Sequence, residues 1–202
     1  LYIIHPGEYF VTGENAVIAT LLGSCISACL FDKENGIYGM NHFMLPGKKN
    51  DNLKIENNIF HIRGGMYGIN AMELIINDMM KRGANRRNLC AKIFGGGSMI
   101  IEKTVAKRNI PYGNITFIKD FLKMESIPIL SEDLGGDHGR KIYFFTDTGK
   151  VLLKRIYNEK VESRIEKEEL KYESKLLLEE KTKKDKGMFI FDNNFEVSQN
   201  GD

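Results

Sequence analysis

Three short segments rich in β-branched and other apolar residues follow one another at residues 16–22, 26–31 and 37–45. The second and third are separated only by the polar turn at residues 32–36. A turn of this length joins antiparallel neighbours, whereas a parallel pair requires a crossover of about a dozen residues or more. The early part of the chain therefore predicts antiparallel strands that run side by side.

Two helices and four further strands are expected up to residue 157. Apolar residues recur at helical spacing between residues 66 and 82, and Gly83 supplies a helix stop. A second helix is expected at residues 115–124, with Asn114 as its N-terminal cap. Further strands are expected at residues 89–94, 127–130, 141–145 and 151–157. Because strands cluster at both ends with only two long helices between them, this order favours an α+β layered fold over a repeating βαβ sheet.

The composition changes after Tyr157, in a chain of 202 residues that suits one domain with an appendage. Residues 158–186 are mostly Glu and Lys. The apolar positions that would share one helical face are Val161, Ile165, Tyr172 and Leu176. Since Glu168 and Glu169 interrupt that stripe, we expect an exposed helix that rests lightly on the domain, with a partner-binding helix as the alternative. The predicted division is one domain at residues 1–157 and a charged extension at residues 158–202.

The charge balance gives no reason to expect nucleic acid or an anionic membrane as a partner. Lys and Arg number 29 against 27 Asp and Glu, which leaves a formal net charge of +2. No apolar run approaches the roughly 18 to 20 residues that span a bilayer, and the first residues lack the pattern of a signal peptide. We therefore expect a cytoplasmic protein without membrane insertion.

Cys25 is the strongest candidate for a nucleophile. It directly follows Gly23 and Ser24, at a turn between two strands where glycine lets the backbone bend sharply. The N–H groups near Gly23 and Ser24 could then hold an oxyanion. A thiol with a pKa of about 8.5 is largely protonated at neutral pH, so a working nucleophile needs an adjacent base. His42 lies in the next strand of the predicted antiparallel pair and could lie level with Cys25.

Residue types alone leave two alternatives open. Buried free cysteines and hydrogen-bonded core histidines are common, and Cys29 and Cys90 fit that structural role because they lie in apolar strand patterns. Three cysteines also make a disulfide framework unlikely in a reducing compartment. A metal site could use Cys25, Cys29, His42 and His61, but the two cysteines do not form a close CxxC pair.

Two further motifs favour structural interpretations. Gly95, Gly96 and Gly97 follow a predicted strand and could cradle a phosphate, but they lack the P-loop ending and the dinucleotide-binding fingerprint. A tight turn packed close to the active-site strands is favoured. Glu132 and Asp133 precede a Gly-Gly pair and are expected in a solvated loop.

Four motifs together resemble the chemoreceptor glutamine deamidase family, CheD, over about residues 3–157. In chain order they are Thr20-Leu21-Leu22-Gly23-Ser24-Cys25, then Asn41-His42-Phe43-Met44-Leu45-Pro46, then Ala91-Lys92-Ile93-Phe94-Gly95-Gly96-Gly97, and finally Glu132-Asp133-Leu134-Gly135-Gly136 with Arg140-Lys141-Ile142-Tyr143-Phe144-Phe145. Their order makes a chance agreement improbable.

The resemblance implies a single α/β/β sandwich domain with a Cys-His-Thr active site, which falls on Cys25, His42 and Thr20. It implies that receptor glutamines are converted to glutamate through a cysteine thioester, with no metal or organic cofactor. Chemotaxis receptors and a CheC-type phosphatase are the implied partners. The alternative function is a non-catalytic adaptor that docks on such a phosphatase or on the receptor.

Overall fold

The computed structural model describes residues 1–45, 65–98 and 105–185. The strands are β1 (Tyr2–Ile3), β2 (Tyr9–Thr12), β3 (Val17–Leu22), β4 (Ile26–Asp32), β5 (Ile37–Asn41), β6 (Cys90–Gly95), β7 (Ile129–Leu134), β8 (Gly139–Phe145) and β9 (Lys150–Ile156). The helices are α1 (Gly65–Lys81), the short 3-10 helix η2 (Arg86–Asn88), α2 (Val105–Met124) and α3 (Glu159–Asp185).

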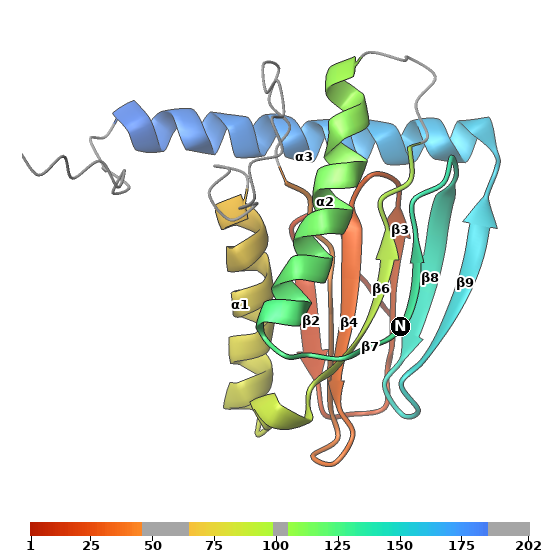
Figure 1. Ribbon diagram of the computed structural model, residues 1–202. Helices are drawn as coiled ribbons and strands as arrows, with labels where there is room; N and C mark the ends of the chain where they lie inside the picture. Colours follow the sequence, from red (N-terminus) through yellow and green to blue (C-terminus); the bar gives the residue numbers. More distant parts are fainter. Residues whose placement is uncertain (46–64, 99–104, 186–202) are drawn as a thin grey trace, which may run out of the picture.

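The strands form two stacked sheets, and two helices cover one of them (Figure 1). One sheet has the order β2-β5-β4-β6-β7 and the other the order β1-β3-β8-β9. One apolar cluster joins α1 and α2 to the five-stranded sheet, and a second cluster fills the space between the sheets. The pairs β1–β3 and β6–β7 are parallel, while the other strand pairs are antiparallel. The predicted α/β/β layering with mixed, largely antiparallel strands is confirmed.

The predicted antiparallel pair is β4 and β5. Asp32 lies opposite Ile37 at the turn, and an isolated bridge continues the pairing from Ile26 to Phe43. Every residue of β4 is buried, because this central strand has the helices on one face and the second sheet on the other. Cys25 and Cys29 face the second sheet.

The strand before Cys25 lies in the other sheet. β3 pairs with β8 and β1 rather than with β4, so the link from Gly23 to Cys25 crosses between the two sheets. The partners of β3 in β8 lie more than a hundred residues away in the chain, and the local pattern of β3 does not specify them.

Helix α1 agrees with the sequence analysis, but α2 does not. Gly83 ends the α1 region with a positive φ of 102°. Helix α2 begins at Val105 instead of residue 115, and Asn114 is a fully buried residue inside it, not a cap. The expectation failed because Pro111 and Gly113 disfavour a helix interior, so Asn114 looks like a cap when its distant hydrogen-bond partners are unknown.

The expected solvated loop at Glu132 and Asp133 is also wrong. Both residues belong to β7, which pairs in parallel with β6. The Asp133 carboxylate accepts hydrogen bonds from the guanidinium groups of Arg140, at 2.7 Å, and Arg155. These ion pairs allow an acidic residue to lie in a half-buried strand.

The largest correction concerns α3, which lies across one end of the strands (Figure 1). Ile165, Glu169 and Leu176 are only 2%, 6% and 4% exposed, so Glu169 is part of the buried face instead of interrupting it. A carboxylate in such a stripe is expected to face water, but hydrogen-bond donors on the domain compensate the burial of Glu169. The division at residue 157 stays a prediction.

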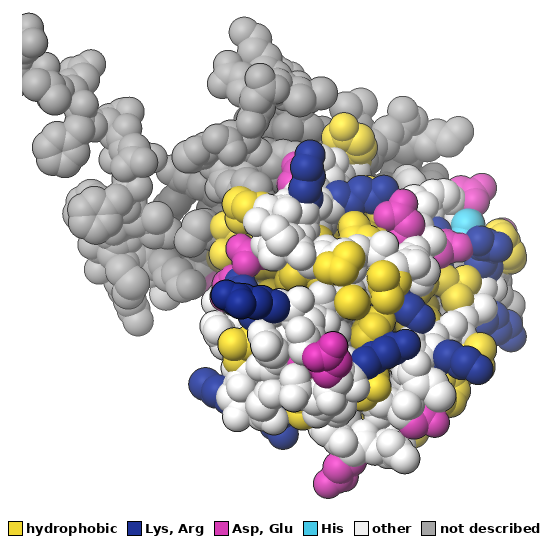
Figure 2. All heavy atoms as spheres, turned by 60° about the horizontal axis from the view of Figure 1, so that its bottom comes forward, with side chains coloured by type: hydrophobic (Ala, Val, Ile, Leu, Met, Phe, Trp, Pro, Cys, Tyr) yellow, Lys and Arg dark blue, Asp and Glu magenta, His cyan; other side chains and the backbone are white. Residues whose placement is uncertain are grey.

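The surface and the remaining segments say little more about the function of the protein. On the face shown in Figure 2, Lys and Arg side chains are mixed with Asp and Glu side chains and with hydrophobic ones. This mixture is consistent with the net charge of +2. Among the helices described, none is both long enough and apolar enough to cross a bilayer. His61, named in the metal alternative, and residues 186–202 of the charged extension lie outside the described residues.

Candidate active site

Thr20, Cys25 and His42 are brought together between the two sheets. Thr20 lies in β3 between Ile18 and Leu22, whose side chains face the inter-sheet core, and strand alternation turns Thr20 the same way. His42 directly follows β5, and Cys25 directly precedes β4. The pairing of β4 with β5 places Cys25 and His42 on one face of the sheet as diagonal neighbours. All three residues are at most 2% exposed.

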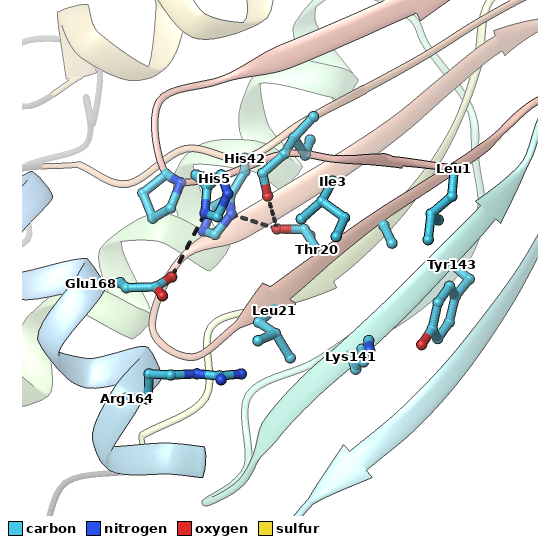
Figure 3. Close-up of a pocket in the computed structure, with 13 residues that line it drawn as sticks. Leu1, Ile3, His5, Thr20, Leu21, His42, Lys141, Tyr143, Arg164 and Glu168 are labelled. Carbon is cyan, nitrogen blue, oxygen red and sulfur yellow. Dashed lines mark hydrogen bonds and ion pairs between the residues drawn. The ribbon is translucent and has the colours of Figure 1, made fainter.

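Thr20 fixes the orientation of the His42 ring. Its hydroxyl group donates to the Ile4 carbonyl oxygen at 2.7 Å and lies 2.8 Å from His42 Nδ1 (Figure 3). Because the hydroxyl proton is already donated, the oxygen accepts from an Nδ1–H group. The neutral imidazole then carries its lone pair on Nε2, which is buried and has no hydrogen-bond partner among the residues described.

A carboxylate from α3 occupies the backbone donors beside Cys25. Glu169 Oε1 accepts from the N–H groups of Gly23 at 2.9 Å and Cys25 at 3.1 Å. Oε2 accepts from the Ser24 N–H group at 3.0 Å and from the Ser24 hydroxyl group at 2.6 Å. The predicted oxyanion-binding residues, Gly23 and Ser24, therefore do present N–H groups that hold a negatively charged oxygen.

The candidate nucleophile and base lie close to this carboxylate. Cys25 Sγ, a ring nitrogen of His42 and a carboxylate oxygen of Glu169 all lie within 4.8 Å of one another. Burial raises the pKa of the Cys25 thiol well above its usual value, and the charges of Glu169 and Glu173 raise it further. Burial lowers the pKa of His42 to about 3, with a smaller effect from His5. Mainly because of burial, both the thiol and the imidazole are neutral at pH 7.

The link from Gly23 to Cys25 is held from its other side through its carbonyl groups. The Gly97 N–H group donates to Gly23 O at 2.6 Å, and the Gly96 N–H group donates to Cys25 O at 2.8 Å. The Asn114 side chain donates to Ser24 O at 2.8 Å. The carbonyl groups of Gly23 and Ser24 share peptide planes with the N–H groups of Ser24 and Cys25, so these contacts preorganise those two N–H groups beside the thiol.

The glycine run is thus the tight turn that was expected beside the active-site strands.

Two residues of the site, Asn114 and Glu169, were not predicted from the sequence. Asn114 also accepts from the Leu45 N–H group at 2.8 Å, so it joins the two segments that carry Cys25 and His42. No local pattern marks either residue, since each acts through contacts with residues far away in the chain.

In the structure, the group of residues that could hold a metal ion differs from the group predicted from the sequence. Cys25, His42 and Glu169 form the cluster, and Cys29 is not among them. Both Glu169 oxygens already accept hydrogen bonds from backbone N–H groups. Such donors suit an anion, whereas a cation would have to draw the carboxylate away from them.

A cavity of about 320 Å³ opens beside Thr20 and His42 (Figure 3). The N-terminal segment and β3 supply its apolar lining, while Lys141, Arg164 and Glu168 supply charges at its edge. Cys25 is not among the residues that line this cavity. The cavity therefore borders the imidazole but not the thiol.

Comparison with known proteins decides the family. The model of the family described as "CheD chemotactic sensory transduction" matches residues 44–155. A protein of Herminiimonas arsenicoxydans named "Probable chemoreceptor glutamine deamidase CheD" is 46% identical over 153 residues, which cover 76% of this chain and 72% of the relative. The chain belongs to the CheD family.

Two other relatives of this CheD chain carry the same family name. The "Probable chemoreceptor glutamine deamidase CheD 1" of Shewanella oneidensis is 47% identical over 153 residues, which cover 76% of this chain and 71% of the relative. The relative of the same name from Geobacter sulfurreducens is 45% identical over 155 residues, which cover 76% of each chain. The resemblance found in the four sequence motifs is confirmed.

Proposed function

We propose that this CheD protein converts glutamine side chains of chemotaxis receptors to glutamate, with Cys25 as nucleophile, His42 as base and Thr20 as a positioning residue. The observation that carries the proposal is the Glu169 carboxylate held by the N–H groups of residues 23–25 beside the thiol. A site that binds a glutamate carboxylate in this position binds the product of glutamine deamidation. The names of the relatives give the receptor as substrate.

In the proposed first half-reaction, His42 Nε2 takes the thiol proton and Cys25 Sγ attacks the carboxamide carbon. The carboxamide oxygen becomes anionic, and the N–H groups of Gly23, Ser24 and Cys25 stabilise it. His42 then returns the proton to the nitrogen, the C–N bond breaks, and ammonia leaves behind a thioester.

In the second half-reaction, His42 deprotonates a water molecule that attacks the thioester carbon. The S–C bond breaks, the thiol regains its proton, and glutamate is formed. The same N–H groups stabilise the second oxyanion. Thiol, imidazole and backbone donors supply each step, so the proposal needs no metal or organic cofactor.

The place of action and the second partner are also part of the proposal. The substrate is the cytoplasmic region of the receptor, which places the enzyme in the cytoplasm. The family resemblance adds a CheC-type phosphatase as a binding partner. Co-elution of the two purified proteins in size-exclusion chromatography would support that association, and separate elution at micromolar concentrations would contradict it.

The test of the function is mass spectrometry of receptor cytoplasmic fragments after incubation with the protein. We expect a gain of about one dalton at specific glutamines, the mass change when a carboxamide becomes a carboxylate through a thioester. Because Glu169 occupies the proposed oxyanion donors, Glu169→Ala is assayed beside the wild type. No mass gain with either protein would contradict the proposal, and binding without turnover would favour the adaptor function.

Thr20→Val is expected to lower kcat about 10- to 100-fold with KM changed by less than about twofold. The variant keeps the shape of the side chain but removes the oxygen that accepts from His42 Nδ1–H. Thr20→Ser is expected to restore most of the loss, because it restores the hydroxyl group. Steady-state kinetics on one receptor fragment measures both, and equal activity of Thr20→Val and wild type would contradict the positioning role.

A further inference from the structure

One face of α3 is built to fit over the candidate active site. Only two residues separate β9 from the helix, and the Asn158 side chain caps it by accepting from the N–H groups of Lys160 and Val161. Ile165, Glu169 and Leu176 are buried on this face. Their spacing of four and seven residues is that of one helical stripe. The helix therefore delivers one carboxylate to a defined position.

Two contacts on the C-terminal side of Glu169 help to fix the helix in register. Tyr172 packs against Gly7, where an added Cβ atom would lie only 2.4 Å from the tyrosine ring. The Tyr67 hydroxyl group of α1 donates to Leu176 O at 3.3 Å. The backbone of Gly7 in turn donates to His42 O at 2.7 Å. The residues around the imidazole thus contact α3 directly.

The buried stripe of α3 does not require a carboxylate at position 169. An apolar side chain would complete the buried stripe without the desolvation of a charge, whereas a carboxylate requires compensating donors. It finds them in the N–H groups of Gly23, Ser24 and Cys25, and these donors hold it within 4.8 Å of the thiol sulfur. The same carboxylate also disfavours the thiolate next to it, which opposes nucleophilic attack.

We propose that α3 is an autoinhibitory segment that holds the Glu169 side chain in the active site as a mimic of the glutamate product. This inference rests on the proposed function and adds its regulation. The receptor segment and α3 compete for the same donors, so substrate binds only the fraction of molecules in which α3 has moved away. Occlusion of this kind raises the apparent KM by the inverse of that fraction and leaves kcat unchanged.

The first test uses alkylation of Cys25 by iodoacetamide in the full-length chain, followed by peptide mass spectrometry. Glu169→Ala removes the carboxylate, and Glu169→Lys replaces it with an ammonium group that has no acceptor for the three N–H donors. We expect Cys25 to react at least about tenfold faster in Glu169→Lys than in the wild type, with an increase also in Glu169→Ala. The matched control is Glu179→Ala, which removes an exposed carboxylate from the same helix and should not change the rate. Equal rates in the wild type and both Glu169 variants would overturn the proposal.

The second test measures kinetics on a receptor fragment. We expect KM to fall about tenfold in Glu169→Ala, with kcat within about twofold of the wild type. An unchanged or higher KM in a variant that unfolds as cooperatively as the wild type would overturn the proposal. If no protein turns over a receptor fragment, the proposed function fails, and the alkylation rates still decide whether α3 occludes Cys25.

The third test converts the helix into a substrate. In Glu169→Gln, the introduced carboxamide lies where the product carboxylate lies, so Cys25 Sγ can attack it and water can release the thioester. The products are glutamate and ammonia, and the chain gains about one dalton at position 169. The gain should be absent when Cys25→Ala is combined with Glu169→Gln, and absent at position 179 in Glu179→Gln. A protein that deamidates receptor fragments but leaves the introduced glutamine unchanged would overturn the assignment of Glu169 as a product mimic.

Discussion

Cys25→Ala is expected to abolish glutamine deamidation while leaving the fold intact. The Sγ atom is the proposed nucleophile, and loss of the nucleophile in a catalytic constellation lowers kcat by about a thousandfold or more. Alanine fits the space of the buried thiol, and the backbone contacts of the link from Gly23 to Cys25 do not involve the side chain. Turnover measured by mass spectrometry on a receptor fragment, with circular dichroism for the fold, tests both parts.

The other two cysteines serve as controls for Cys25→Ala. Cys29 is buried between the sheets, and Cys90 is half-buried at the start of β6. Neither contacts the donors of the site, so Cys29→Ala and Cys90→Ala should keep the wild-type rate. Cys29→Ala should lose about 1 kcal/mol of stability, because it leaves a small cavity. A wild-type rate in Cys25→Ala would refute the proposed mechanism.

Gly95→Ala is expected to destabilise the protein by about 3 kcal/mol or more and to lower turnover at the same time. Gly95 has a φ of 116°, which disfavours any other residue. An added Cβ atom would also lie 2.1 Å from Cys25 O. That contact is with backbone, so relief requires the link that carries the N–H donors to move. Urea unfolding and turnover on a receptor fragment are the measurements.

Gly113→Ala is the matched control for Gly95→Ala. Gly113 lies inside α2, and an added Cβ atom there meets nothing within 4 Å. Replacement of a helical glycine by alanine should stabilise the protein by about 0.5–1 kcal/mol and leave turnover unchanged. If Gly95→Ala unfolded at the same urea concentration as Gly113→Ala, the close packing of the glycine turn against Cys25 would not be essential.

The local part of the site could be predicted from the sequence. A short polar turn forces β4 and β5 together, and their pairing then places Cys25 and His42 on one face of the sheet. The glycine run was expected to pack beside these strands, and Gly95 does so. Nucleophile and base lie at the two ends of one hairpin, so their geometry follows from strand period and turn length.

The long-range part of the site could not be predicted in this way. Thr20 reaches His42 only because β3 belongs to the opposite sheet, and that assignment depends on its pairing with β8. Asn114 resembles a helix cap in sequence but ties Ser24 to Leu45 in the structure. A short polar side chain has several possible partners, and only the folded chain selects among them.

By itself, the sequence determined the layered α+β fold, the α1 helix, the β4–β5 pair and the candidate nucleophile and base. Only the tertiary structure decided what Glu169 does. A charged residue in an amphipathic pattern predicts exposure, because burial of an uncompensated carboxylate is unfavourable. The compensating donors belong to residues 23–25, about 145 positions earlier in the chain, and no periodicity within α3 contains that information.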